Sequence, residues 1–403
     1  MAAMEKNNKT LNVPHLRFPE FSGEWEKCTL GDFGKIITGN TPPTADEKNY
    51  DNGTHLWASP ADLGTTKYIE STQTLLSDIG FEKTRTFPSN SILVTCIGST
   101  IGKMGMSKIE MASNQQINTI VPVQHDVNFV YYAVQSRFPR YLSSIAVQAV
   151  PILSKSAFEK LSNFTTSKEE QTKIGNLLAL IDERIDTQKK IIEDLKKLKD
   201  AISKSLLSRS DLLERMIPLS QVGMLKNGYA FQSSSYDSSG EYEIITIANV
   251  TGERYISTEG CNRIHTTPSD LQLHQKLKDG DILISLTGNV GRVSLCNKEG
   301  KYLLNQRVGL LELQVGVNRE FVYQAISSPK FERGMSSCGQ GAAQMNIGKG
   351  DVENFVIPYS NNTQNLQRIS LILKGYDELV LIESKRFQFL QSQKRYFIST
   401  LFI

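Results

Sequence analysis

The chain has 403 residues, of which 39% are hydrophobic and 22% are charged, and its formal net charge at pH 7 is +3. This composition predicts two or three folded domains and excludes a disordered chain, a histone-like polycation or an acidic tail. No two of the five cysteines form a CxxC pair, which disfavours a zinc site or a disulfide framework. Because no hydrophobic leader and no apolar run long enough to cross a bilayer is present, we expect a soluble protein of the reducing cytoplasm.

In chain order, a short N-terminal segment (residues 1–23) precedes a first globular region, residues 24–165. This region carries 12 basic and 13 acidic residues and is rich in Gly, Ser, Thr and Asn. Short apolar runs separated by such residues are typical of strands joined by turns. We therefore expect a nearly neutral, β-rich domain of mixed structure.

A long helix is predicted next, within residues 166–210. From Lys168 to Leu207 there is no proline, and apolar residues recur at spacings of three and four, which indicates a coiled-coil seam. The seam residues are Ile174, Leu178, Ile181, Ile185, Ile192, Leu195, Ile202 and Leu206.

A second globular region (211–360) and a second long helix (361–403) follow in the same order. The apolar residues of the second helix have the same spacing as those of the first. They are Ile369, Leu373, Tyr376, Val380, Leu390, Phe397 and Leu401.

The two halves of the chain are copies of one unit. SILVTCIGSTIGKMGMS (91–107) matches DILISLTGNVGRVSLC (281–296), and Asn114-Gln115 matches Asn305-Gln306. Such a repeat predicts an α+β fold with two β-rich domains about a pseudo-twofold axis. Neither long helix buries its apolar seam alone in water, so we expect the two helices to pair as an antiparallel coiled coil.

The sequence resembles the specificity (S) subunits of type I restriction–modification enzymes. The resemblance rests on VPHLRFPEFSGEWEKCTLGD (13–32), TGNTPP (38–43), KNGYAFQSSSY (226–236), the twin glycine segments and EEQTKIGNLLALIDERI (169–185). The repeated order of domain and helix adds to it. The second helix departs from the pattern, because it opens with NLQRISLILKGYDELV in place of an EEQ-type start.

This resemblance implies that each globular region is a target-recognition domain that reads one half of a split DNA site. It implies that the helices set the spacer and bind two modification (M) subunits, which carry S-adenosylmethionine and methylate adenine. Two restriction (R) subunits, which use ATP and Mg, would join the complex. The S subunit itself would hold no cofactor, no metal and no catalytic residue.

The two glycine loops do not fit a nucleotide-binding loop. Gly98–Lys103 has three residues between its glycines where a phosphate-binding loop has four, and Met104 replaces the required Ser or Thr. We expect a strand, a tight turn and a strand in each copy. The turn presents Lys103 in the first copy, and Asn289 and Arg292 in the second. Each cation either faces solvent or contacts phosphate or guanine.

The paired segments 114–116 and 305–307 have two interpretations: their amides shape a turn, or they read the edge of adenine. Polar loops around residues 38–48, 226–236 and 338–344 are further candidates for groove or phosphate contact. The full set of DNA-contact candidates is Asn40, Thr41, Lys103, Gln115, Gln116, Lys226, Phe231, Asn289, Arg292, Gln306, Arg307, Gln340 and Gln344.

Three alternatives remain open at this stage. The chain serves a fused restriction–methylation polypeptide, or it is a duplicated protein scaffold without DNA contact, or its glycine loops belong to an NTPase or transferase. The last is disfavoured, because the sequence has no methyltransferase, zinc-peptidase, serine-hydrolase or nuclease signature.

Overall fold

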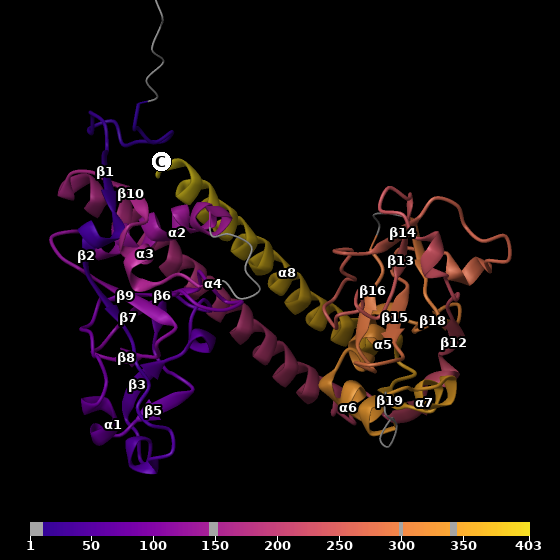
Figure 1. The fold of residues 1–403 in the computed structure, drawn as a ribbon. Helices are drawn as coiled ribbons and strands as arrows, with labels where there is room; N and C mark the ends of the chain where they lie inside the picture. Colours follow the sequence, from indigo (N-terminus) through magenta and orange to yellow (C-terminus); the bar gives the residue numbers. More distant parts are fainter. Residues whose placement is uncertain (1–10, 145–151, 298–300, 339–344) are drawn as a thin grey trace, which may run out of the picture. The chain divides into compact units, whose positions relative to one another are not determined.

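A computed structural model describes residues 11–144, 152–297, 301–338 and 345–403 (Figure 1). The chain divides into two compact units. Unit 1 comprises Met1–Lys189 with Arg386–Ile403, and unit 2 comprises Lys190–Lys385. Each unit therefore contains one globular region together with parts of both long helices.

Unit 1 is built on a five-stranded sheet, a three-stranded sheet and a two-stranded ribbon (Figure 1). The five-stranded sheet has the order β2 (Gly34–Thr38), β9 (Ile117–Pro122), β6 (Ile92–Thr95), β7 (Met104–Ser107) and β4 (Tyr68–Ile69). The three-stranded sheet has the order β5 (Thr74–Leu76), β3 (His55–Ala58) and β8 (Ala112–Ser113), and β1 (Glu26–Thr29) pairs with β10 (Ser162–Thr165). The helices of this region are α1 (Asp78–Glu82), α2 (Val127–Ser144) and α3 (Lys155–Glu159).

Unit 2 repeats this arrangement, with a four-stranded sheet in place of the five-stranded one. Its four-stranded sheet has the order β12 (Gly223–Asn227), β18 (Val308–Leu313), β15 (Ile282–Ser285) and β16 (Val293–Leu295). The second sheet has the order β14 (Asn262–Ile264), β13 (Tyr242–Ile245) and β17 (Lys301–Leu304), and β11 (Arg215–Pro218) pairs with β19 (Val356–Tyr359). The helices are α5 (Arg319–Ile326), α6 (Pro329–Cys338) and α7 (Lys349–Glu353). The strand orders match sheet by sheet, which confirms the predicted repeat.

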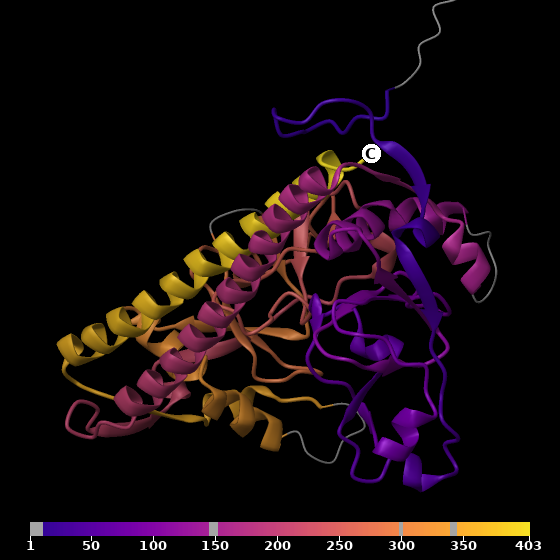
Figure 2. The same ribbon diagram turned by 90° about the vertical axis from the view of Figure 1, so that its left-hand side faces the viewer.

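The two long helices, α4 (Lys168–Leu207) and α8 (Thr363–Thr400), each contribute to both units. In unit 1 the first turns of α4 pack against the last residues of the chain, Leu401 and Phe402. In unit 2 the end of α4 packs against the beginning of α8, through Ile202 and Ile369. The helices are thus antiparallel within each unit (Figure 2), in the predicted direction.

Burial along the predicted seam is uneven. The buried residues lie in the first turns of α4 and α8 or directly after the end of α8, namely Ile174, Leu178, Ile181, Ile369, Leu373 and Leu401. The remaining seam residues are only partly buried, namely Ile185, Ile192, Leu195, Ile202, Leu206, Tyr376, Val380, Leu390 and Phe397. Most of the apolar stabilisation of the pair therefore lies where it meets a globular region.

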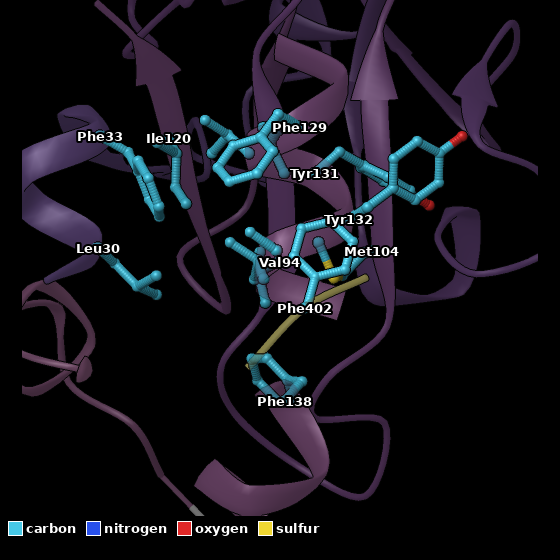
Figure 3. Packing of buried hydrophobic residues seen from close by; sticks show 14 of the residues in the cluster. Leu30, Phe33, Val94, Met104, Ile120, Phe129, Tyr131, Tyr132, Phe138 and Phe402 are labelled. Carbon is cyan, nitrogen blue, oxygen red and sulfur yellow. The ribbon is translucent and has the colours of Figure 1, made fainter. Parts of the chain in front are cut away.

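The residues that follow α8 complete the core of unit 1. Phe402 lies among Val94, Met104 and Phe129 (Figure 3), and its ring centroid is 5.5 Å from that of Phe129. The ring of Trp25 meets it edge-on at 6.1 Å. The globular region and the helix pair of unit 1 therefore share one hydrophobic core, and each contributes side chains that the other needs for close packing.

The N-terminal segment is fastened to the beginning of α4. The Arg17 guanidinium donates two hydrogen bonds of 2.8 Å to the Glu170 carboxylate, and Gln171 donates to the Thr166 carbonyl at 2.7 Å. Burial alone raises the pKa of Glu170, but the hydrogen bonds from Arg17 and Thr166 outweigh it, and the net shift is downward. The EEQ motif therefore positions the first helix on its own globular region.

Candidate nucleic-acid interface

The two asparagines predicted to shape a turn do so in both units. In unit 1 the Asn114 Oδ1 accepts a hydrogen bond of 3.0 Å from the backbone N–H of Gln116. In unit 2 the Asn305 Oδ1 accepts one of 3.1 Å from the N–H of Arg307. Both asparagines are buried, whereas Gln115, Gln306 and Arg307 are exposed. In each turn the asparagine side chain therefore bonds to the backbone of the turn itself, and the residues that follow it are exposed to solvent.

A glycine brings a second loop against each asparagine turn. A Cβ atom at Gly39 would lie 2.1 Å from the Ser113 carbonyl oxygen, and one at Gly228 would lie 2.2 Å from the Asn305 carbonyl oxygen. Only glycine permits so close an approach. In unit 1 this places the Thr41 hydroxyl 2.6 Å from the Gln115 Oε1, to which it donates.

Asn40 follows Gly39 in this loop, and its side chain is held by hydrogen bonds to the backbone. Its side chain donates to the Lys83 carbonyl at 2.9 Å and accepts from the Arg85 N–H at 2.7 Å. Gln116 lies close to the glycine hairpin, because a Cβ at Gly98 would be 3.8 Å from its amide nitrogen. Thr41, Gln115 and Gln116 therefore come together, while Asn40 holds the loop in place.

In unit 2 the corresponding segments surround a hollow of about 740 Å³. Its lining includes Gln306 and Arg307 from the asparagine turn and Thr287 from the glycine hairpin. Asn346, from the segment before α7, and Lys349, the first residue of α7, line it as well. The Thr287 hydroxyl and the Asn346 carboxamide oxygen are 2.5 Å apart. Among the described residues that line it, the hollow has two cations and no carboxylate, which suits phosphate and base edges.

Asn346 and Lys349 were absent from the sequence-based candidates. The signal for Lys349 was the Gly348-Lys349 pair, which begins a short helix and repeats Ser154-Lys155 at the start of α3 in unit 1. Nothing in the local pattern indicated that this helix start lies beside residue 307, because only the pairing of residue 287 with residue 346 brings them together.

The glycine hairpins have the expected form, β6 with β7 and β15 with β16. Gly98 and Gly102 have φ of 97° and 92°, which favours glycine at both positions. The Lys103 side chain lies against Gly64 and lines a separate hollow of about 590 Å³ beside α4 and α8. Arg292 lies against Gly252 and forms an ion pair of 3.6 Å with Glu332. Neither cation is among the residues that line the 740 Å³ hollow.

The remaining candidates are dispersed. Lys226 on β12 forms an ion pair of 3.4 Å with Glu312 on β18, and the half-buried Phe231 packs on the Tyr229 ring at 4.9 Å. Asn289 is exposed at the tip of its hairpin. Gln340 and Gln344 lie outside the described residues.

Within residues 11–144, 152–297, 301–338 and 345–403, no group of three His, Cys, Asp or Glu side chains is arranged to hold a metal ion. No helix in the same part of the chain is long and apolar enough to cross a membrane.

A family model described as the type I restriction modification DNA specificity domain matches the chain twice, over residues 22–197 and 215–391. The chain belongs to this family. The two matches correspond to the two halves of the repeat, and together they account for most of the chain.

Individual relatives agree. The chain is 24% identical to the type I restriction enzyme MjaVIII specificity subunit of Methanocaldococcus jannaschii, over 98% of this chain and 95% of that protein. It is 32% identical to the HindI specificity subunit of Haemophilus influenzae, but over only 36% of this chain and 32% of that protein. The fold is that of the crystal structure of a type I S subunit from M. genitalium, with a TM-score of 0.63, 18% identity and coverage of 97% and 99%.

Proposed function

We propose that this specificity subunit reads a bipartite DNA target, one half with each globular region. The observation that carries the proposal is the double match to a DNA specificity domain, in which both copies have the same asparagine turn and the same close glycine loop. The near-zero charge of each region keeps non-specific attraction to DNA small, so that affinity depends on local contacts and on partner subunits.

The hollow of unit 2 has the chemistry for both kinds of DNA contact. The Arg307 guanidinium suits the O6 and N7 acceptors of guanine, and the Gln306 amide suits adenine. Lys349, at the start of α7, suits a phosphate. In unit 1 the corresponding amides are Gln115 and Gln116, and Thr41 orients the first of them.

The helix pair acts as the spacer and as the binding surface for the M subunits in this proposal. Both long helices expose large apolar side chains to solvent, among them Leu180, Leu371, Leu379 and Phe389. Exposed apolar side chains of this kind are typical of surfaces that a partner covers. S-adenosylmethionine would be held by the M subunits and ATP with Mg by the R subunits, whereas this chain would contribute no catalytic group.

The test is to co-express the chain with its M subunit and to sequence the methylome of the host. We expect methylated adenines in a split target with a fixed gap. A chain in which residues 24–165 are replaced by those of another specificity subunit is expected to change one half of the target only. A continuous target, or a change in both halves, would overturn the proposal. Absence of DNA affinity at low salt, with M subunits bound, would favour the protein-scaffold alternative.

A further inference from the structure

A buried polar cluster joins the globular region of unit 1 to both long helices, and we call it cluster 1. Asp182 of α4 accepts a hydrogen bond of 2.5 Å from the Tyr132 hydroxyl of α2, and the Lys394 ammonium of α8 is 2.6 Å from its other oxygen. Lys67, next to β4, donates to the Tyr132 hydroxyl at 3.0 Å and to the Asn128 side-chain oxygen at 2.7 Å. Three separate elements thus meet at one carboxylate.

Unit 2 contains the same construction, cluster 2, with the roles of the long helices exchanged. Asp377 of α8 receives the Lys199 ammonium of α4 at 2.5 Å and the Gln324 amide of α5 at 2.6 Å. Arg254 donates to Asp377 at 2.9 Å and makes two further hydrogen bonds, of 2.8 and 2.7 Å, to Glu320. Asp377 and Arg254 are both buried.

The two clusters correspond residue by residue through the internal repeat. KY (67–68) matches RY (254–255), and FVYYAV (129–134) matches FVYQAI (321–326). The matched pairs are Lys67 with Arg254, Asn128 with Glu320, Tyr131 with Tyr323, Tyr132 with Gln324, Asp182 with Asp377 and Lys394 with Lys199. Lys67 also lies over the rings of Tyr68, Tyr131 and Tyr132, at 5.3, 5.5 and 4.7 Å. Arg254 lies over the rings of Tyr255 and Tyr323, at 5.5 and 5.2 Å.

The same geometry is therefore made twice with different side chains. Tyr132 and Gln324 differ in shape and chemistry, yet both donate to the carboxylate of a long helix. Buried ion pairs contribute little net stability, because desolvation of the charges offsets their attraction. Buried ion pairs instead specify how the elements are placed. Because a buried charge without its partner is costly, one relative placement of the elements is favoured over neighbouring ones.

From this we infer that Asp182 and Asp377 are positioning residues, which fix each recognition domain on the helix pair of its own unit and so set where its half-site lies along the DNA. The inference rests on the proposed function, because it assigns a role in bipartite reading. It concerns residues that lie outside the DNA-contact candidates, on the helices themselves.

The experiment uses the complex of the chain with its M subunit and measures methylation of three targets. These are the native target and versions with the gap shortened or lengthened by one base pair. We expect Asp182→Asn and Asp377→Asn each to reduce the preference for the native gap at least fivefold, while the preferred bases of both half-sites stay the same. Asp186→Asn and Glu378→Gln, matched changes at exposed carboxylates of the same two helices, are expected to leave the preference unchanged.

A purely structural role would lower methylation of all three targets together, and that result would overturn the inference. Lys394→Gln is a milder second variant, at which the same loss of preference is expected. If Asp182→Asn does not fold and folded Lys394→Gln keeps the native preference, the cluster serves folding alone and the inference is wrong. A wild-type complex that methylates no split target would instead refute the proposed function.

Discussion

Lys199 of α4 and Asp377 of α8 are held 2.5 Å apart in unit 2, and the same two residue types meet in unit 1 with the helices exchanged. There Lys394 belongs to α8 and Asp182 to α4, at 2.6 Å. The aspartate and the lysine are 17 residues apart on each helix. The repeat therefore extends to the individual ion pair that joins the two long helices in each unit.

The two clusters differ in charge, and this difference leads to the first prediction. Arg254 in cluster 2 faces the Glu320 carboxylate, whereas Lys67 in cluster 1 faces the neutral Asn128. We expect Asn128→Glu to stabilise unit 1 by about 1–2 kcal/mol, because it supplies a charged acceptor to a buried cation. Both tryptophans, Trp25 and Trp57, lie in unit 1, so urea denaturation followed by tryptophan fluorescence reports on this unit.

Gln73→Glu is the matched control for this substitution, since it adds the same charge to unit 1 at an exposed position. It is expected to leave the denaturation midpoint nearly unchanged. A lower midpoint for Asn128→Glu than for the wild type would contradict the idea that Lys67 in cluster 1 lacks a charged acceptor at this position.

The second prediction concerns pH. Burial lowers the pKa of Lys67 to about 8, although Asp182 acts against the shift. An unfolded lysine titrates near pH 10.4, so between these values the unfolded chain binds a proton that the folded chain has released. The free energy of unfolding of unit 1 therefore rises with pH across this window, by at most about 1.4 kcal/mol per pH unit. The charged and titratable groups around Lys67 are Tyr68, Tyr131, Tyr132, Asp126, Asp182, Glu183 and Lys394.

Lys67→Met isolates this contribution, because it keeps a side chain of similar length without a charge. Tryptophan-detected urea denaturation at pH 7, 8, 9 and 10 should show the wild type gaining stability relative to the variant. If the difference between the two proteins is constant with pH, Lys67 does not release its proton in this range.

A third prediction tests the fastening of the N-terminal segment. The bidentate contact with Arg17 holds the pKa of Glu170 below its usual value, so its contribution to stability is present near neutral pH and is lost on acidification. Glu170→Gln is expected to destabilise unit 1 by about 1–3 kcal/mol at pH 7, because it leaves Arg17 without its charged partner. Glu169→Gln, at the exposed neighbouring position, should change the midpoint little.

The repeat, the two long helices, the glycine hairpins and the asparagine turns could be predicted from the sequence, because each depends on local spacing. The turn at Asn114 needs only the residues beside it. Cluster 1 could not be predicted, since Lys67, Asp182 and Lys394 come from three segments that only the tertiary fold brings together. The repeated segments FVYYAV and FVYQAI did contain one indication of it. They differ strongly at one position, Tyr132 against Gln324, and this residue contacts the helix aspartate in each unit.

The fourth prediction concerns the hollow of unit 2. We expect Arg307→Ala to weaken discrimination at one half-site by about 1–3 kcal/mol, the range of one good bidentate contact with a base. Competition binding of the assembled complex to targets that differ at single positions measures it. Arg333→Ala removes an exposed arginine that does not line the hollow and should not change the base preference. An effect of Arg307→Ala on both half-sites would contradict the assignment of one half to each unit.

The last prediction tests the helix pair as a spacer. The two helices pass from one unit to the other between Lys189 and Lys190 in α4 and between Lys385 and Arg386 in α8. Insertion of one heptad at both places preserves the apolar pattern of each helix and adds about 10 Å, the length of about three base pairs. We expect methylome sequencing to show a target with a longer gap and the same two half-sites. Insertion in α4 alone shifts the two helices out of register and should abolish methylation, and an unchanged gap after the double insertion would show that the helices do not set the spacing.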